Sequence, residues 1–124
     1  MERVIRDGKV AVLYSPGWGS GWFTWNHNEE LLYDPTIVEM VESRARLLPP
    51  EEVENLNSFW NEENEWTSKI IDYCREKYTN DNYYFGGAND LEIKWIPIGT
   101  RFRVEEHDGN EVVILEGEDE WMIA

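Results

Sequence analysis

Two glycine-rich aromatic segments and a pair of arginines are the residues of this sequence best suited to binding chemistry. The segments are SPGWGSGWFTWNHN, residues 15–28, and TNDNYYFGGAND, residues 79–90. Aromatic rings can stack on a planar ligand, and glycine lets the backbone approach that ligand closely. Arg101 and Arg103 are two positions apart in an expected strand, so their guanidinium groups share one face and could hold phosphate oxygens.

Residues that could catalyse a reaction are less clearly arranged. His27 and His107 lie in no metal-ligand or triad pattern. Cys74, the single cysteine, falls on an apolar helix stripe, where a buried and inert thiol is expected. The glycine segment PGWGSG lacks the Lys-Ser/Thr ending of a phosphate-binding loop, and the 26 acidic residues single out no acid–base pair. The sequence therefore predicts a binding protein with no catalytic residue, no metal and no cofactor.

Composition and charge restrict both the fold and the partner. A chain of 124 residues suits one ligand-binding domain over residues 1–124, and 41 % hydrophobic residues with seven Trp can supply its core. The net charge of −15 opposes binding to DNA, RNA and anionic membranes, although local arginines can still hold a small phosphorylated ligand. One cysteine and an N-terminus without a signal-like apolar stretch favour a reducing cytoplasm.

Local patterns predict a hairpin and two helical regions in the first two thirds of the chain. Asp7-Gly8 separates two β-rich runs over residues 3–14, which is typical of a two-residue hairpin turn. Asp34-Pro35 predicts an N-cap and first turn of a helix that Pro49-Pro50 would stop. Its expected apolar face is Ile37, Val38, Val41, Ala45 and Leu48. A second helical region begins near residue 50, is interrupted or weakened over 55–64, and is best defined by the stripe Trp66, Ile70, Tyr73 and Cys74.

The last third of the chain changes to the two-residue period of strands. Apolar and polar residues alternate over residues 91–95 and again over 101–104, with a turn at 97–99 between them. Asp108-Gly109 predicts a second hairpin before the strand at 112–115. The expected fold class is therefore α+β: a small antiparallel sheet with an N-terminal hairpin, two central helical regions and C-terminal strands.

Both ends of the chain resemble one family of small phage-encoded proteins. The similar segments are VIRDGKVAVLYSPGWGSGWFTWN and YFGGANDLEIKWIPIGTRFRVEEHDGNEVVILEGEDEWMIA. They resemble the first type of Thoeris anti-defence protein, whose members bind and sequester the cyclic ADP-ribose isomer made by the bacterial Thoeris system. Some relatives assemble as hexamers and bind cyclic oligonucleotides of the CBASS defence system. The resemblance covers about half of the chain and is weakest over residues 45–80.

The resemblance implies a phage anti-defence sponge in the host cytoplasm, which binds a small cyclic nucleotide-type signal without degrading it. It also implies a homo-oligomer, a dimer or a hexamer. In such a site the adenine needs an aromatic wall, the ribose hydroxyls need amides or carboxylates, and the diphosphate needs cations. The residues that this sequence offers for these three roles are Trp18, Trp22 and Phe85, then Asn89 and Asp90, then Arg101 and Arg103.

A structural interpretation of the same residues leads to a different function. The Trp rings could fill the core or anchor an interface, and Arg101 and Arg103 could pair with Glu92 or Glu105. The acidic chain would then be a protein-binding phage accessory protein that blocks a basic host surface. Under either interpretation the tail GEDEWMIA, residues 117–124, ends in apolar side chains, which favours docking on a second copy.

Overall fold

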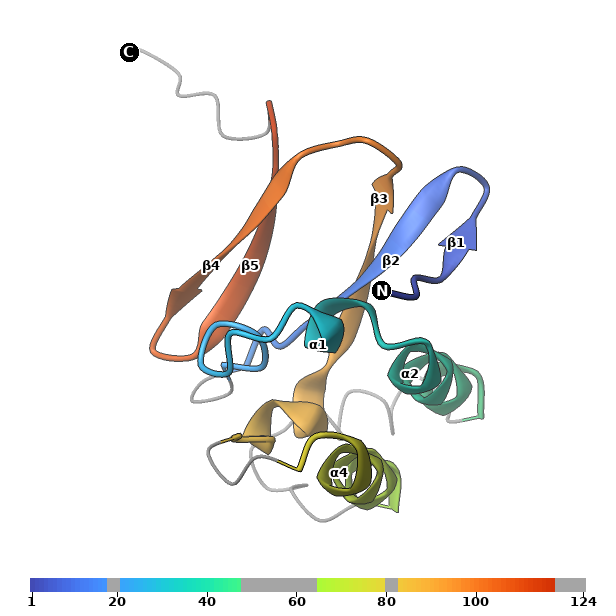
Figure 1. The fold of residues 1–124 in the computed structure, drawn as a ribbon, viewed down its shortest axis with the longest axis vertical. Coiled ribbons are helices and arrows are strands. Elements are labelled where there is room, and N and C mark those ends of the chain that lie inside the picture. Colours follow the sequence, from blue (N-terminus) through green and yellow to red (C-terminus); the bar gives the residue numbers. More distant parts are fainter. Residues whose placement is uncertain (18–20, 48–64, 80–82, 118–124) are drawn as a thin grey trace.

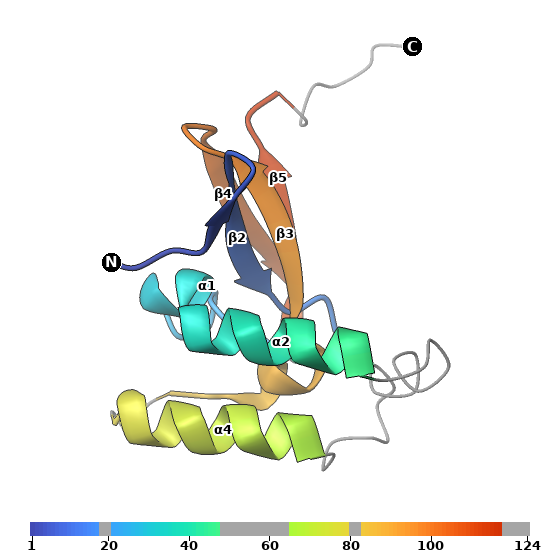
Figure 2. The same ribbon diagram turned by 90° about the vertical axis from the view of Figure 1, so that its right-hand side faces the viewer.

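The computed structural model describes residues 1–17, 21–47, 65–79 and 83–117 of the chain. Figures 1 and 2 show α2 and α4 side by side at one end of the strands. The expected α+β class is confirmed. None of the described helices is both long and apolar enough to cross a bilayer. The elements in chain order are β1 (Ile5–Arg6), β2 (Lys9–Tyr14), α1 (Glu30–Tyr33), α2 (Pro35–Leu47), α4 (Glu65–Lys77), the 3₁₀ helix η1 (Gly86–Asp90), β3 (Glu92–Pro97), β4 (Phe102–His107) and β5 (Asn110–Leu115).

Both expected hairpin turns are present. Asp7 and Gly8 have φ of 51° and 75°, and they join β1 to β2. Asp108 and Gly109, with φ of 52° and 85°, join β4 to β5 in the same way. Positive φ at both central residues matches the twist of the flanking strands, and Asp-Gly adopts it at low cost. These two turns set the register of both hairpins.

The strands are divided between two antiparallel sheets, ordered β1-β2-β3 and β4-β5. Strand β2 is the centre of the first sheet and pairs with β3 from Lys9↔Pro97 to Tyr14↔Glu92. Ala11, Val12 and Leu13 are all fully buried, which means that both faces of β2 are covered. Ala11 and Leu13 pack with α2 and α4 residues, whereas Val12 packs in a second cluster with Val113 of β5.

Helix α2 begins as its sequence predicts. Pro35 is its first residue, and Asp34 Oδ1 accepts hydrogen bonds from the backbone amides of Thr36 (3.0 Å) and Ile37 (3.3 Å). The expected apolar face is confirmed over Ile37, Val38 and Val41, each at most 5 % exposed. The Ala45 side chain, Leu48 and the stop at Pro49-Pro50 lie outside the described residues.

Helix α4 carries the second expected stripe. Ile70 and Cys74 are fully buried, and Tyr73 is half-buried beside them. The Trp66 side chain and the segment 50–64 lie outside the described residues. Beyond the helix the chain returns through residues 83–85 into η1, which packs against α4 and leads into β3. This return brings a second set of aromatic side chains next to the C-terminal part of α4.

Candidate functional site

A cavity of about 500 Å³ lies between the C-terminal part of α4 and the returning segment 83–86. We call it the tyrosine pocket, because most of the rings around it are tyrosines. On the helix side, residues 71, 75 and 78 follow the i, i+4, i+7 spacing of one helical face. The volume is in the range of small-molecule sites. The lining residues that matter here are Ile71, Arg75, Tyr78, Tyr83, Tyr84 and Phe85.

The rings of the pocket continue into the protein core. Tyr78 meets Tyr83 edge-on, with ring centroids 6.0 Å apart and an interplanar angle of 78°. Tyr83 and Phe85 follow at 5.8 Å, and Phe85 and Trp22 at 6.1 Å. Such tilted pairs each add about 0.5–1.5 kcal/mol beyond the area they bury. The pocket wall is therefore an extension of the core around Trp22, not a set of isolated surface rings.

The outer rim of the pocket is held by the glycine-rich segment that follows β2. Asn26 Oδ1 accepts from the backbone amide of Tyr84, and Asn26 Nδ2 donates to the Tyr84 carbonyl, both at 2.8 Å. The same Nδ2 also donates to the Trp22 carbonyl at 2.7 Å. The Tyr84 ring lies 5.4 Å from the Trp25 ring, and these two residues are 47 % and 44 % exposed. Tyr84, which lines the pocket, therefore forms an exposed aromatic pair with Trp25 of the glycine-rich segment.

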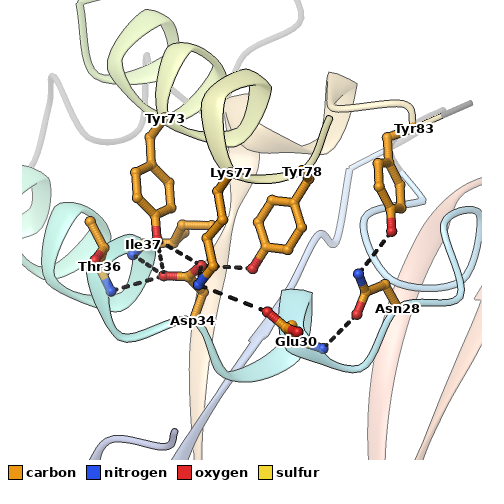
Figure 3. Close-up of polar contacts among 9 residues, drawn as sticks. All are labelled: Asn28, Glu30, Asp34, Thr36, Ile37, Tyr73, Lys77, Tyr78 and Tyr83. Atoms are coloured by element: carbon orange, nitrogen blue, oxygen red, sulfur yellow. Dashed lines mark hydrogen bonds and ion pairs between the residues drawn. The ribbon is translucent and has the colours of Figure 1, made fainter. Parts of the chain in front are cut away.

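Polar contacts fix the hydroxyl ends of two pocket rings (Figure 3). The Tyr78 hydroxyl donates to Asp34 Oδ2 at 2.7 Å, and Asn28 Nδ2 donates to the Tyr83 hydroxyl at 2.8 Å. Asp34 also accepts from Lys77 Nζ at 2.9 Å. Burial and the neighbouring Asp34 carboxylate raise the pKa of Tyr78, so its hydroxyl remains a neutral donor.

Asp34 stays ionised although it is almost completely buried, with 2 % of the residue exposed. Burial alone would raise the pKa of this carboxyl. The hydrogen bonds from Tyr78, Lys77, Tyr73 and the Ile37 amide outweigh burial and lower the pKa below its usual 3.8. The result is one carboxylate that joins the start of α2 to the end of α4.

The structure places the expected ligand residues of the aromatic segments in different surroundings. Phe85 lines the tyrosine pocket, whereas Trp22 is fully buried in the core and donates its indole N–H to the Leu31 carbonyl at 2.8 Å. The Trp22 ring is therefore not accessible to a ligand in this structure. Asn89 Oδ1 accepts from the Thr67 hydroxyl of α4 at 3.3 Å, and Asp90 is 8 % exposed. Trp18 lies outside the described residues.

Arg101 and Arg103 line a different cavity of about 340 Å³, together with Phe102, Ile114 and Glu116. The described residues that line this cavity and those that line the tyrosine pocket do not overlap. Arg103 Nε donates to Glu105 Oε1 at 2.8 Å, so the glutamate pairing weighed from the sequence is found for this arginine. Within one copy, the structure does not bring the two arginines together with Phe85.

A buried carboxylate that sequence reasoning missed organises the first glycine-rich segment. Glu111 is 1 % exposed. Its Oε1 accepts from the amide (3.0 Å) and hydroxyl (3.2 Å) of Ser15, and its Oε2 accepts from the amides of Phe23 (2.9 Å) and Thr24 (2.8 Å). A glutamate close to a hairpin turn is normally exposed to solvent, so the local sequence around Glu111 does not indicate this buried role.

Arg75 and the tyrosines of the pocket could have been found from the sequence by two signals. Tyr83 and Tyr84 directly precede Phe85 in the segment that was singled out. Arg75 lies three residues before Tyr78, so both fall on one helix face. The sequence could not predict that the returning segment 83–86 faces this part of α4, because that contact depends on the packing of η1 against α4.

The remaining reactive groups offer little chemistry at this site. Cys74 is fully buried, and burial together with the Asp34 carboxylate raises the pKa of its thiol to about 12. Within the described part of the chain, no group of three or more His, Cys, Asp and Glu side chains is placed to hold a metal ion. The tyrosine pocket offers ring faces and one guanidinium group, an arrangement that suits a planar ring attached to an anion.

Comparisons of this chain with known proteins identify no family. No protein-family model, no curated protein and no solved structure matches the chain. The features of the chain that bear on its function are the pocket, the charges around it and the segments at the two ends of the sequence.

Proposed function

We propose that this protein is a phage anti-defence sponge that binds a cyclic ADP-ribose isomer in the host cytoplasm and sequesters it without degrading it. The observation that carries the proposal is the tyrosine pocket, where four aromatic side chains and Arg75 surround about 500 Å³. The resemblance of both chain ends to the sponge family supports the same ligand class. The ring segment of that resemblance, YFGGAND, includes Tyr84 and Phe85 of the pocket.

The chemistry of the pocket matches the parts of such a ligand. Stacking of a base on an aromatic ring contributes about 1–3 kcal/mol. A guanidinium group can fork onto the oxygens of a diphosphate, and a hydrogen bond to a charged group contributes about 1.5–3 kcal/mol. The net charge of −15 repels an anion at long range, so a local cation such as Arg75 is needed for binding. Because the Cys74 thiol is buried and protonated, it cannot attack the bound ligand.

Binding and turnover are tested in one experiment. The protein is titrated by calorimetry with cyclic ADP-ribose isomers, with cyclic oligonucleotides and with linear ADP-ribose as comparison. The complex is then freed of unbound ligand, denatured by heat and analysed for what is released. We expect intact cyclic ligand, about one equivalent per site. Linear ADP-ribose accumulating beyond the number of sites would show an enzyme, and no binding of any probe would favour the acidic, protein-blocking function.

The location of the site is tested by matched arginine variants. Replacing Arg75 by Ala removes the cation of the tyrosine pocket, and we expect affinity to fall about 10- to 100-fold. Lys69→Ala on the same helix changes an exposed cation that does not line the pocket, and it serves as control. The variants Arg101→Ala and Arg103→Ala test the second cavity. Loss of binding in these two, with Arg75→Ala unaffected, would move the phosphate contact to the second cavity.

A further inference from the structure

Asn28, two residues before α1, and Asp34, the residue before α2, each bind a backbone amide at a helix start and also a ring of the tyrosine pocket (Figure 3). Asn28 Oδ1 accepts from the backbone amide of Glu30, the first residue of α1, at 3.0 Å. Its Nδ2 donates to the Tyr83 hydroxyl at 2.8 Å. One amide side chain thus closes the turn at the helix start and holds the far end of a pocket ring.

Asp34 repeats this arrangement six residues later in the chain. Its Oδ1 accepts from the Thr36 and Ile37 amides at the start of α2, and its Oδ2 accepts from the Tyr78 hydroxyl at 2.7 Å. The lysine next to this tyrosine, Lys77, donates to the same Oδ2 at 2.9 Å. The Asp34 carboxylate therefore accepts hydrogen bonds from both ends of the joint, the start of α2 and the end of α4. These hydrogen bonds hold it in one position.

The short helix α1 makes both of these anchors rigid. Leu31, Leu32 and Tyr33 of α1 are buried, at no more than 8 % exposure. Leu31 packs in the cluster that contains β2, α2 and α4 residues, while Leu32 packs in the second cluster with β5. Asn28 and Asp34 flank this buried segment, so their side chains are fixed relative to the core.

A tyrosine ring held at its hydroxyl end is held at both ends of its long axis. The Cα–Cβ bond fixes one end and the hydrogen bond fixes the other, so rotation about χ1 would break the hydrogen bond. Binding a ligand against an already ordered ring avoids the cost of immobilising that side chain. Tyr78 and Tyr83 are neighbours with centroids 6.0 Å apart, so the two anchors together set the angle between two walls of the pocket.

We propose that Asn28 and Asp34 are positioning residues, which hold the rings of Tyr83 and Tyr78 in their ligand-binding orientation before the ligand arrives. The identity of the ligand rests on the proposed function. The ordering of the rings is a property of the protein without ligand and can be measured separately.

The first test uses affinity for the tightest-binding cyclic ADP-ribose isomer. Asn28→Ala and Tyr83→Phe remove the same hydrogen bond from its two sides, and we expect each to weaken binding about fivefold. The double variant should be no weaker than either single variant, since the contact can be lost only once. Asn28→Asp keeps an acceptor for the Glu30 amide and can accept from the Tyr83 hydroxyl, so it should bind within about twofold of the unmodified protein.

The second test needs no ligand. Tyrosines are replaced by 3-fluorotyrosine, and the ¹⁹F signals of positions 78 and 83 are assigned with the Tyr78→Phe and Tyr83→Phe proteins. An anchored ring keeps one χ1 rotamer and a ¹⁹F shift set by its folded surroundings, so Asn28→Ala should move the signal of position 83 towards that of the unfolded protein and leave that of position 78. Asp34→Ser should do the reverse, because its hydroxyl oxygen retains an acceptor for the α2 cap but is too short to reach the Tyr78 hydroxyl. Glu29→Ala, an exposed neighbour, is the control.

Each outcome decides the proposal. ¹⁹F signals that move towards those of the unfolded protein, together with a non-additive loss of affinity, support positioning. Unchanged signals in both Asn28→Ala and Asp34→Ser would overturn it, and so would affinity losses that add in the double variant. If no cyclic ADP-ribose isomer binds the unmodified protein, the proposed function fails, and the ¹⁹F signals alone then decide whether these residues order the rings.

Discussion

At the level of single residues, one buried carboxylate, that of Glu111, joins described residues of the glycine-rich segment 15–28 to β5. Glu111 collects hydrogen bonds from Ser15, Phe23 and Thr24, while its own amide donates to the Ser15 carbonyl at 2.8 Å. These contacts join the end of β2 to the start of β5. They also place Trp22 under Phe85, which lines the tyrosine pocket.

Replacing Glu111 should therefore destabilise the whole protein. Glu111→Ala leaves three backbone donors without this acceptor, one of them buried and two partly buried, and a buried donor left in this way costs about 1–3 kcal/mol. We expect the free energy of unfolding of Glu111→Ala to be lower by about 3 kcal/mol or more. The loss should be smaller for Glu111→Gln, which keeps one acceptor oxygen. Urea denaturation measures both, with the exposed Glu39→Ala as control. Equal stabilities of Glu111→Ala and Glu39→Ala would contradict this role.

At the level of elements, the joint between α2 and α4 depends on one carboxylate. Asp34 caps α2 and also accepts from Tyr73 at 3.0 Å, from Lys77 and from Tyr78, which all belong to α4 or directly follow it. Each of the two helices has 13 residues, a length at which an isolated helix is marginal in water, so this joint and the shared apolar faces stabilise both.

Because Asp34 joins α2 to α4 as a carboxylate, the free energy of unfolding should vary with pH in the acid range. The folded pKa of Asp34 lies below the usual 3.8, so the unfolded chain takes up the proton more readily as pH falls. Its contribution is therefore complete above about pH 4 and is lost as pH falls through the folded pKa. We expect Asp34→Asn to be about 1.5–3 kcal/mol less stable at pH 7, from lost hydrogen bonds to a charged group.

Denaturant titrations of both proteins between pH 7 and pH 2.5 measure this difference. It should stay constant down to about pH 4 and shrink below that value, because the protonated Asp34 of the unmodified protein resembles the amide. A difference that does not change over the whole range would show that the charge of Asp34 contributes nothing to the joint.

At the level of the whole molecule, strong acidity is combined with several exposed apolar side chains. The net charge is −15, yet Ile5, Trp25, Tyr84, Ile98 and Val112 are each between 44 % and 59 % exposed. Exposed apolar residues of this size favour contacts between copies, whereas like charges oppose them. The apolar tail residues Trp121–Ile123, on which the expected oligomer also depends, lie outside the described residues.

We expect a homo-oligomer, at least a dimer, whose formation strengthens with salt. The Debye length falls from about 10 Å at 0.1 M to about 3 Å at 1 M, which screens the repulsion between acidic copies and leaves apolar contacts intact. Light scattering at micromolar protein concentration, at low and at high salt, measures the mass directly. A monomer under both conditions would refute the oligomer, and dissociation at high salt would show that ion pairs rather than apolar side chains join the copies.

The part of the site that could be predicted from sequence is the part that involves near neighbours. The adjacent rings, glycines and asparagines of YYFGGAND predict a ligand contact at Phe85, and Phe85 lines the tyrosine pocket. Trp22 has a similar local sequence but is fully buried. No local pattern distinguishes a ring that turns inward from one that lines a cavity. The residue after Trp22, Phe23, donates its amide to Glu111, which is 88 positions away along the chain, and such a long-range contact leaves no local pattern.

The sequence alone determined the two Asp-Gly hairpins, the start of α2 at Asp34-Pro35 and the apolar stripes of α2 and α4. Each of these depends on residues within about four positions of one another, whose backbone preferences and periodicity act locally. Only the tertiary structure decided that Asp34 meets Tyr78, that Asn28 meets Tyr83, and that Arg101 and Arg103 line a cavity separate from the tyrosine pocket. Hydrogen bonds and packing between distant segments form only once the chain is folded, so the chemistry of the pocket is a property of the packing of α4 against segment 83–86.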